Sequence, residues 1–470
     1  MFNFLASTII ETMPVFDNPY NLNFIGNFIR WLVESLPNMG LGVIVFTIIL
    51  KLITLPADIW SRVSMKKNNL KMERMRPQLE KLQRQYANNK EQYNLKIQSL
   101  YKKEGYSAFS TCLPTILTLV IFFIVINQFS NYSNYANLQL ISGMANSYNT
   151  AVDTYNETYD SDLVLKVGNE YYINQDKIIT DQIISDAGVS KTVDETTGFN
   201  NYLTVDINKF ATYVKGLNEQ GYEGVTVGKE IVASGSTYVF SRENYSADAT
   251  DEFINQTVTN KVFSDICQEK ILEVKTVARQ ASADFYRANV PSFLWVKNIW
   301  VEDLPWKHPV KNTFSEYNFT IRQGCKAVNA GINMEDSSYA ELTFALQDEK
   351  TQPNGYLILV ILSIGIMFLS TIISNRTQKA QLELQSVDGA AASTNKMMMW
   401  MMPIMFGIFA FIYTASFSLY MVVSSVLSTL GTILINKLVE IRFAKKLAED
   451  ESQKDKRFRK SNSQVNNKKK

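Results

Sequence analysis

The residue with the clearest chemical potential is Lys51, which lies inside an apolar run of the 470-residue chain. Thr47 precedes it by one helical turn and would lie on the same face. A charge at the bilayer centre costs roughly 2.5–3.5 kcal/mol on insertion scales, so a cation at this depth indicates a function. The other apolar runs contain no acidic residue and Asp58 is two turns away, so we expect an unpaired cation in a water-accessible pocket that attracts acidic side chains. Snorkelling of the lysine toward the headgroups is the alternative.

Enzymatic chemistry has little support in the sequence. The one histidine of the chain is His308, so no Ser/His/Asp or Cys/His set can be built away from it. The apolar runs also lack the paired aspartates that intramembrane proteolysis would need. We therefore expect neither an enzyme nor a cofactor or metal site. Three cysteines are too few for a disulfide framework, and whether Cys267 and Cys325 pair is left open.

Five apolar runs surround Lys51 and predict an all-α polytopic membrane protein with a five-helix transmembrane core. The predicted spans are residues 38–60, 111–130, 355–374, 397–414 and 415–437. The last two form one nearly continuous uncharged stretch that is too long for a single helix. A tight turn near residues 413–418 is therefore expected.

The distribution of charge predicts how these spans are oriented. Residues 59–110 hold 12 basic and 4 acidic side chains, and residues 437–470 hold 12 and 5. Residues 131–350 hold 18 basic and 30 acidic side chains. Because cytoplasmic segments carry the excess of Lys and Arg, we expect a multi-pass membrane protein with its N-terminus outside and its C-terminus in the cytoplasm.

Patterns between the spans predict the remaining parts. Residues 1–37 are expected outside with an interfacial amphipathic helix at 21–36, and 131–350 as a strand-rich exterior insert. Residues 61–110 are expected as a cytoplasmic helical hairpin and 375–396 as a cytoplasmic loop. Residues 438–470 are expected as a basic cytoplasmic tail that begins as a helical extension and ends disordered. Within the insert, short β-branched segments at 171–179, 202–207 and 224–240 predict strands. Residues 251–289 predict a helix that Pro291 closes.

Taken together, these residues resemble the YidC family of membrane protein insertases, as a Gram-positive-like member with a large exterior insert. The segment from Gly40 through Thr47 and Lys51 to Pro56 is similar to the family's first core helix, in which an arginine usually stands at the place of Lys51. Further similar segments are 100–105 followed by Cys112-Leu113-Pro114, 293–296 with Ile299-Trp300 and Asp303-Leu304, 396–406, and Leu419-Tyr420.

The resemblance implies a mechanism and a set of site residues. A positively charged hydrophilic groove would receive hydrophilic segments of nascent membrane proteins and release their apolar segments into lipid. The groove residues implied are Thr47, Lys51, Thr118 and Tyr420, and the cytoplasmic hairpin would recruit substrate through Met65, Met72, Met75, Leu79 and Leu82. The basic tail would approach the ribosome, with the Sec translocon as a further partner. The basic segments also suit anionic lipid, and nothing indicates binding to DNA.

Several departures from the family pattern leave other functions open. Lysine in place of arginine loses bidentate carboxylate binding but keeps the point charge. The family often has Gln and Pro where Thr118 and Val120 stand, and Pro and Gly where Thr414 and Ser416 stand, and its large exterior domain normally precedes the first core helix. A transporter or channel that binds a small anion at Lys51 is the alternative, and an envelope scaffold that displays the insert is the third. The methionines at 397–405 suit either an adaptable surface or ordinary contact with lipid.

Overall fold

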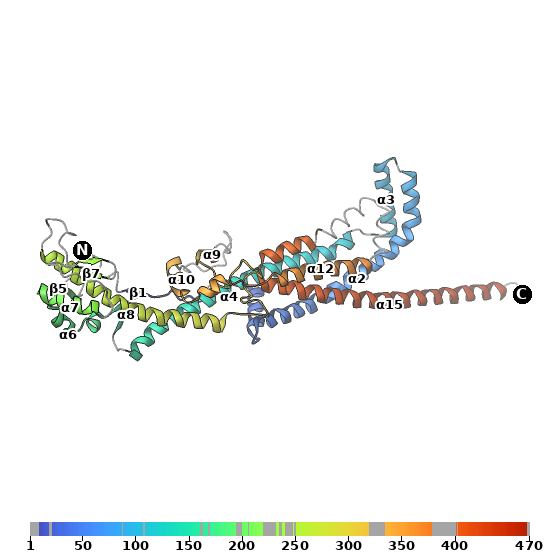
Figure 1. Cartoon of the computed structure of the whole chain (residues 1–470). Coiled ribbons are helices and arrows are strands. Elements are labelled where there is room, and N and C mark those ends of the chain that lie inside the picture. Colours follow the sequence, from blue (N-terminus) through green and yellow to red (C-terminus); the bar gives the residue numbers. More distant parts are fainter. Residues whose placement is uncertain are drawn as a thin grey trace.

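The computed structural model describes residues 9–467 apart from 18–20, 87, 107–108, 160–162, 168–169, 194–199, 205, 220–231, 235–236, 240–247, 249–250, 319–333, 378–400 and 402. Most of the described residues are helical, and the molecule is elongated (Figure 1). The molecule has a helical bundle and a separate small lobe, and the lobe lies far from the bundle, at the far end of two long helices (Figure 1).

The bundle contains the helices expected to cross a membrane. Among the described residues, two helices are long and apolar enough to span a bilayer, Met39–Gln85 and Ala415–Lys445. Two shorter apolar helices are Ile358–Ser374 and Pro403–Ile412. The fold is thus helical and suited to a membrane, whereas the number of five spans stays a prediction.

Helix α2 (Met39–Gln85) joins the predicted first span to the first arm of the predicted hairpin without a break. Asn38 caps its start, since the Asn38 side chain accepts hydrogen bonds from the backbone N–H groups of Gly40 and Leu41. Pro56 and Pro77 both lie inside the helix. Helix α3 (Lys90–Glu104) then folds back against α2, as the polar turn between two periodic segments predicts.

Helix α4 (Phe109–Tyr159) combines the second predicted span with a rod that extends beyond the bundle. It packs along α8 (Asp251–Asn289), which has the bounds that the sequence predicts (Figure 1). At Gly143 a Cβ atom would lie 2.3 Å from the Phe285 ring, so the absence of a side chain lets the two helices approach closely. Together α4 and α8 form a stalk.

The stalk carries a small lobe with its own apolar core. Its buried side chains include Val189, Phe210, Val214, Val262, Phe263 and Cys267. The lobe contains α6 (Asp181–Ala187), α7 (Ile207–Glu219) and the antiparallel pair β4 (Val189–Val193) and β5 (Asn200–Thr204). A second pair joins β6 (Val232–Ser234) to β7 (Thr237–Val239).

A three-stranded sheet links the N-terminal segment to the insert. Its order is β1 (Ile9–Glu11), β3 (Glu170–Ile173), β2 (Val164–Val167), with antiparallel pairing throughout. Helix α5 (Gln175–Ile178) follows it. Across the described part of 131–350, most residues are helical, so the expectation of a strand-rich insert is not confirmed. The β-branched segments form only short strands, in this three-stranded sheet and in two separate pairs, whereas α4 and α8 contain most of the residues.

The segment that returns from α8 to the bundle forms a compact cap over the helix ends. It contains α9 (Ser315–Asn318), α10 (Asp336–Leu342) and α11 (Gln347–Thr351). Asp303 is fully buried, and its carboxylate accepts hydrogen bonds from the backbone N–H groups of Tyr356 at 2.9 Å and Leu359 at 2.7 Å. These bonds cap α12 (Ile358–Thr377). The cap thereby fixes the start of one bundle helix.

The same cap holds the turn between the last two bundle helices. Helix Pro403–Ile412 ends just before Tyr413, and α15 (Ala415–Asn467) begins after Thr414. The backbone N–H groups of Ala415 and Ser416 each donate at 2.9 Å to the carbonyls of Val301 and Ile299. The turn lies within the range that the sequence predicts. The helical start predicted for the tail is confirmed, whereas its predicted disordered end is wrong, because α15 continues as one helix to Asn467.

Helix α1 (Phe24–Glu34) lies within the segment predicted to be amphipathic and packs against α2. At Gly42 a Cβ atom would lie 2.7 Å from the Val33 backbone, so this contact requires glycine. Trp31 lies on the opposite side and is 63% exposed. Its position at a membrane interface stays a prediction.

Candidate functional site

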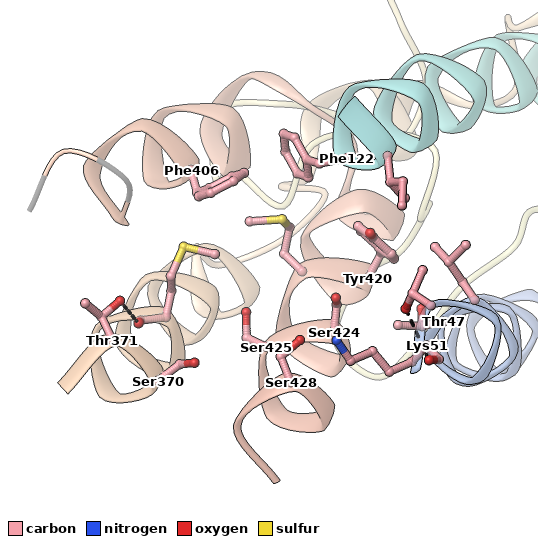
Figure 2. Close-up of a pocket in the computed structure, with 15 residues that line it drawn as sticks. Thr47, Lys51, Phe122, Ser370, Thr371, Phe406, Tyr420, Ser424, Ser425 and Ser428 are labelled. Atoms are coloured by element: carbon pink, nitrogen blue, oxygen red, sulfur yellow. Dashed lines mark hydrogen bonds between the residues drawn. The ribbon is translucent and has the colours of Figure 1, made fainter. Parts of the chain in front are cut away.

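The bundle helices enclose a cavity of about 270 Å³, which is large enough for several water molecules. Its walls come from α2, α4, α12, the helix Pro403–Ile412 and α15 (Figure 2). The lining residues are Thr47, Leu50, Lys51, Thr54, Ile121, Phe122, Met367, Ser370, Thr371, Phe406, Tyr420, Met421, Ser424, Ser425 and Ser428. Segments as far apart in sequence as Thr47 and Ser428 therefore meet around one space.

The chemical character of the cavity changes along the helix axes. Near the starts of α2 and α15 its wall is aromatic, with Phe122 against Phe406 at a ring-centroid distance of 4.4 Å. Further along α15 the wall carries the hydroxyls of Ser424, Ser425 and Ser428. Ser428 is 13 residues from the start of α15, or about 20 Å along the axis at 1.5 Å per residue. The cavity therefore has an aromatic end and a polar end.

Lys51 supplies the positive charge of this cavity. It lies 12 residues from the start of α2, about 18 Å along the helix, so it stands opposite the serines of α15. Figure 2 shows its side chain reaching from α2 toward Ser424 and Ser428. Thr47, one turn earlier, is buried and donates its hydroxyl hydrogen to the Val43 carbonyl at 2.7 Å.

The expectation that Lys51 is unpaired is wrong. Its Nζ atom lies 2.7 Å from Oδ2 of Asp58, and the two side chains are 20% and 29% exposed. Positions seven apart lie two turns apart on one helix face, a separation that the long lysine stem spans. Asp58 thus lies on the same helix as Lys51, toward the predicted cytoplasmic side. This is the direction in which the snorkelling alternative places the lysine ammonium.

Asp58 also acts on a second cation. Arg62, one turn further along α2, interacts electrostatically with Asp58. Its Nη2 atom donates to Oγ1 of Thr432 on α15 at 2.9 Å. A charged chain of Lys51, Asp58 and Arg62 therefore runs along α2 from the cavity to the α2–α15 contact.

Of the four predicted groove residues, Thr47, Lys51 and Tyr420 line the cavity together. Thr118 lies in α4, but its side chain is outside the described residues. The serines of α15 were not among the predicted site residues. Their signal was present in the sequence, since Ser424 and Ser428 are four apart and share one face of an otherwise apolar helix.

The family model of the 60Kd inner membrane protein matches residues 31–169 and 283–442, well over half of the chain. The chain belongs to this family. Every residue that lines the cavity lies within the two matched segments. The unmatched residues 170–282 include the lobe at the end of the stalk, so the lobe is an addition to the part of the fold that the family shares.

Curated relatives of the family carry the name that the sequence resemblance suggested. The membrane protein insertase YidC of Fusobacterium nucleatum subsp. nucleatum is 32% identical over 108 residues, which are 22% of this chain and 51% of that protein. The YidC of Treponema denticola is 30% identical over 110 residues, 23% of this chain and 18% of that protein. That of Caldanaerobacter subterraneus subsp. tengcongensis is 27% identical over 109 residues, 23% and 51%. The resemblance to the YidC family is confirmed, and the chain spans about half or less of each relative's length. No solved structure matches the chain.

The hairpin of this family member has a core made from most of the residues predicted to recruit substrate. Met72, Met75 and Leu79 are buried between α2 and α3, where they pack on Ile97 and Leu100. Leu82 packs on the edge of this cluster and Met65 is half-buried. An apolar stripe on one helix is here covered by the next helix, so these side chains hold the hairpin together. Recruitment through Met72, Met75 and Leu79 would require the two helices to separate.

The remaining candidates for chemistry are dispersed. Among the residues that the structure describes, no group of three or more His, Cys, Asp or Glu side chains could hold a metal ion. His308 Nδ1 lies 2.9 Å from the Gln352 carbonyl in the cap. Cys267 is buried in the lobe, where burial raises the pKa of its thiol to about 12. Cys325 and Met397, Met398, Met399 and Met402 lie outside the described residues.

Proposed function

We propose that this chain is a membrane protein insertase that moves hydrophilic segments of nascent membrane proteins through the Lys51 cavity, without enzymatic turnover. The observation that carries the proposal is a charged, hydroxyl-lined cavity among helices of membrane-spanning composition. Buried polar surface of this kind is costly in lipid unless a polar guest or water uses it. The printed names of the relatives support the same function.

The direction of transport follows from the asymmetry of the cavity. The polar wall with Lys51 and the α15 serines faces the predicted cytoplasmic side, and the ring pair of Phe122 and Phe406 closes the predicted outer side. A polar segment that enters from the cytoplasm would exchange hydrogen bonds with the serine hydroxyls, and Lys51 would attract its acidic side chains. The aromatic closure would keep the cavity from becoming a continuous aqueous pore.

The proposal includes five spans, an exterior N-terminus and insert, and a cytoplasmic hairpin and tail in a bacterial cell membrane. The basic residues of 59–110 and 437–470 support this orientation. The helical, basic end of α15 is a suitable contact for the ribosome or for anionic lipid. Cooperation with the Sec translocon belongs to the same proposal.

The test is insertion of a small single-span protein into liposomes that contain only the purified chain. Lys51→Ala should lower the yield of protease-protected, correctly oriented substrate by several-fold, and Lys51→Arg should retain it, because the charge is the required feature. Lys81→Ala is the matched control, since Lys81 is an exposed lysine on the same helix. Normal insertion of acidic and neutral substrates by Lys51→Ala would refute the role of the cavity.

A second function has one specific observation in its favour. Lysine with several hydroxyl groups is also a binding site for a small anion, so a transporter or channel is the competing proposal. The same liposomes distinguish the two, because anion flux that depends on Lys51 without substrate insertion would establish the transporter. Deletion of residues 170–282 separates both from a scaffold, in which the lobe would be essential and Lys51 dispensable.

A further inference from the structure

The mechanism proposed above gives no role to Asp58, the carboxylate that pairs with Lys51. Its carboxylate is 2.7 Å from the ammonium of Lys51, which lines the cavity expected to receive acidic side chains. Lys51 therefore already has a carboxylate partner when no substrate is present. An acidic substrate residue must compete with Asp58 for the same cation.

Partial exposure makes this pair exchangeable. The two side chains are 20% and 29% exposed, so protein does not enclose the pair, and at the predicted cytoplasmic end of the span we expect water to reach it when it separates. Pairs in such surroundings contribute far less than fully buried ones. A carboxylate brought in by a substrate can thus replace Asp58 at a modest cost.

Arg62 gives the displaced carboxylate another partner. It lies four residues after Asp58 on α2, a spacing and order that favour an acidic–basic pair on a helix. Its guanidinium already interacts electrostatically with Asp58 and is anchored to Thr432 of α15. When Lys51 turns to a substrate, Asp58 remains next to a fixed positive charge. This alternative partner lowers the cost of each exchange.

We propose that Asp58 is a competing carboxylate that holds Lys51 while the cavity is empty and recovers it when the substrate leaves. The proposal rests on the proposed function. It makes Asp58 a determinant of specificity: the cavity retains a segment only when its acidic residues compete successfully, and it releases that segment because Asp58 returns to Lys51. Asp58 acts through Lys51 and does not itself contact the substrate.

The experiment compares two versions of one single-span substrate in liposomes, an acidic version and one in which its Asp and Glu are replaced by Asn and Gln. Photocrosslinking from the translocated segment measures how much substrate is held in the cavity and for how long. With Asp58→Asn, the acidic substrate should be held about five-fold more strongly, equivalent to about 1 kcal/mol, and released more slowly. Retention of the neutral substrate should not change, and a merely structural role would not produce this difference between substrates.

Matched variants make the result specific. Glu80→Gln removes a carboxylate that pairs with Arg76 at 3.1 Å on the exposed part of α2, and it should have no effect on retention. Asp58→Glu keeps the charge and should behave like the wild type, which controls for folding together with the apparent melting temperature of each variant. The double variant Lys51→Ala/Asp58→Asn should match Lys51→Ala.

Each failure has a different meaning. If Lys51→Ala removes the preference for acidic substrate but Asp58→Asn leaves it unchanged, the competing role of Asp58 is refuted and the insertase proposal stands. If Asp58→Asn changes acidic and neutral substrates equally, Asp58 only supports the local structure and the proposal is also refuted. If Lys51→Ala has no effect on either substrate, the proposed function itself fails.

Discussion

The cap residue Asp303 provides a sharp test of how the cap segment holds the bundle. Both of its carboxylate oxygens accept backbone hydrogen bonds at the start of α12, and its own carbonyl accepts a third from Leu357 at 3.1 Å. At Gly355 a Cβ atom would lie 1.8 Å from Oδ1 of Asp303, so this close approach leaves no room for a side chain at position 355. Burial raises the pKa of Asp303, and the N–H groups of Leu359 and Tyr356 oppose that rise.

Asp303→Asn should destabilise the protein by about 2 kcal/mol. The amide keeps one acceptor oxygen but turns an NH2 group toward a backbone N–H, so one hydrogen bond to a charged group is lost, worth about 1.5–3 kcal/mol. Removal of a buried negative charge offsets part of that loss. At about 2–4 °C per kcal/mol, the apparent melting temperature should fall by about 4–8 °C.

The assay is thermal unfolding followed by tryptophan fluorescence in detergent and in liposomes, with amide hydrogen exchange at residues 356–360 as the local readout. Asp284→Asn is the matched control, because Asp284 is 63% exposed and lies 3.8 Å from its Arg287 partner. That variant should stay within about 0.5 kcal/mol of the wild type. An Asp303→Asn protein as stable as Asp284→Asn, with unchanged exchange at the start of α12, would refute the capping argument.

Two further predictions concern the stalk and the hairpin. Burial alone would raise the pKa of Glu341, but Arg279 at 2.6 Å, Lys275 and Tyr148 outweigh burial, so the pKa of Glu341 in the folded protein lies below its ordinary value. The ionised Glu341 should therefore stabilise the fold fully above its unfolded pKa of about 4.3, and this stabilisation should be lost as the pH falls through the folded pKa. Glu341→Gln should cost about 3 kcal/mol at neutral pH and flatten this acid dependence of the melting temperature, and an unchanged acid profile would contradict the assignment. Met75→Ala should cost about 2–5 kcal/mol of local stability because Met75 is 1% exposed between α2 and α3. Leu95→Ala is the control and should be nearly neutral, because Leu95 is 62% exposed. Equal rates of proteolysis of the hairpin in both variants would argue against a packing role for Met75.

The sequence was most informative where one residue type conflicts with its surroundings. Lys51 within an apolar run pointed to a polar cavity, and Thr47 one turn away lines the same cavity. The helix at 251–289 also has its predicted bounds, because its periodicity is long and Pro291 ends it. Conflicts and periodicities of this kind involve only residues that are close together in sequence, so they can be recognised without knowing how distant segments pack.

What the sequence did not reveal depends on distant contacts or on side-chain reach. The stripe of Met72, Met75 and Leu79 predicts an apolar face, but whether a substrate or α3 covers that face is decided by packing. Asp58 was judged too far from Lys51, since the helical rise between them is two turns, yet the lysine stem spans that distance. The serines of α15 become a site only when α2 places Lys51 opposite them.

The unbroken course of α4 has a mechanical consequence. Its 51 residues make a rod about 77 Å long, with Ile121 and Phe122 in the cavity wall and the stalk at its far end. Between the two, Tyr132 packs edge-on against Trp300, and Ser133 and Asn137 both donate hydrogen bonds to the Trp300 carbonyl. This contact supports the helix between its two ends. A sideways load on the stalk is therefore transmitted as a torque to the cavity wall through one continuous helix.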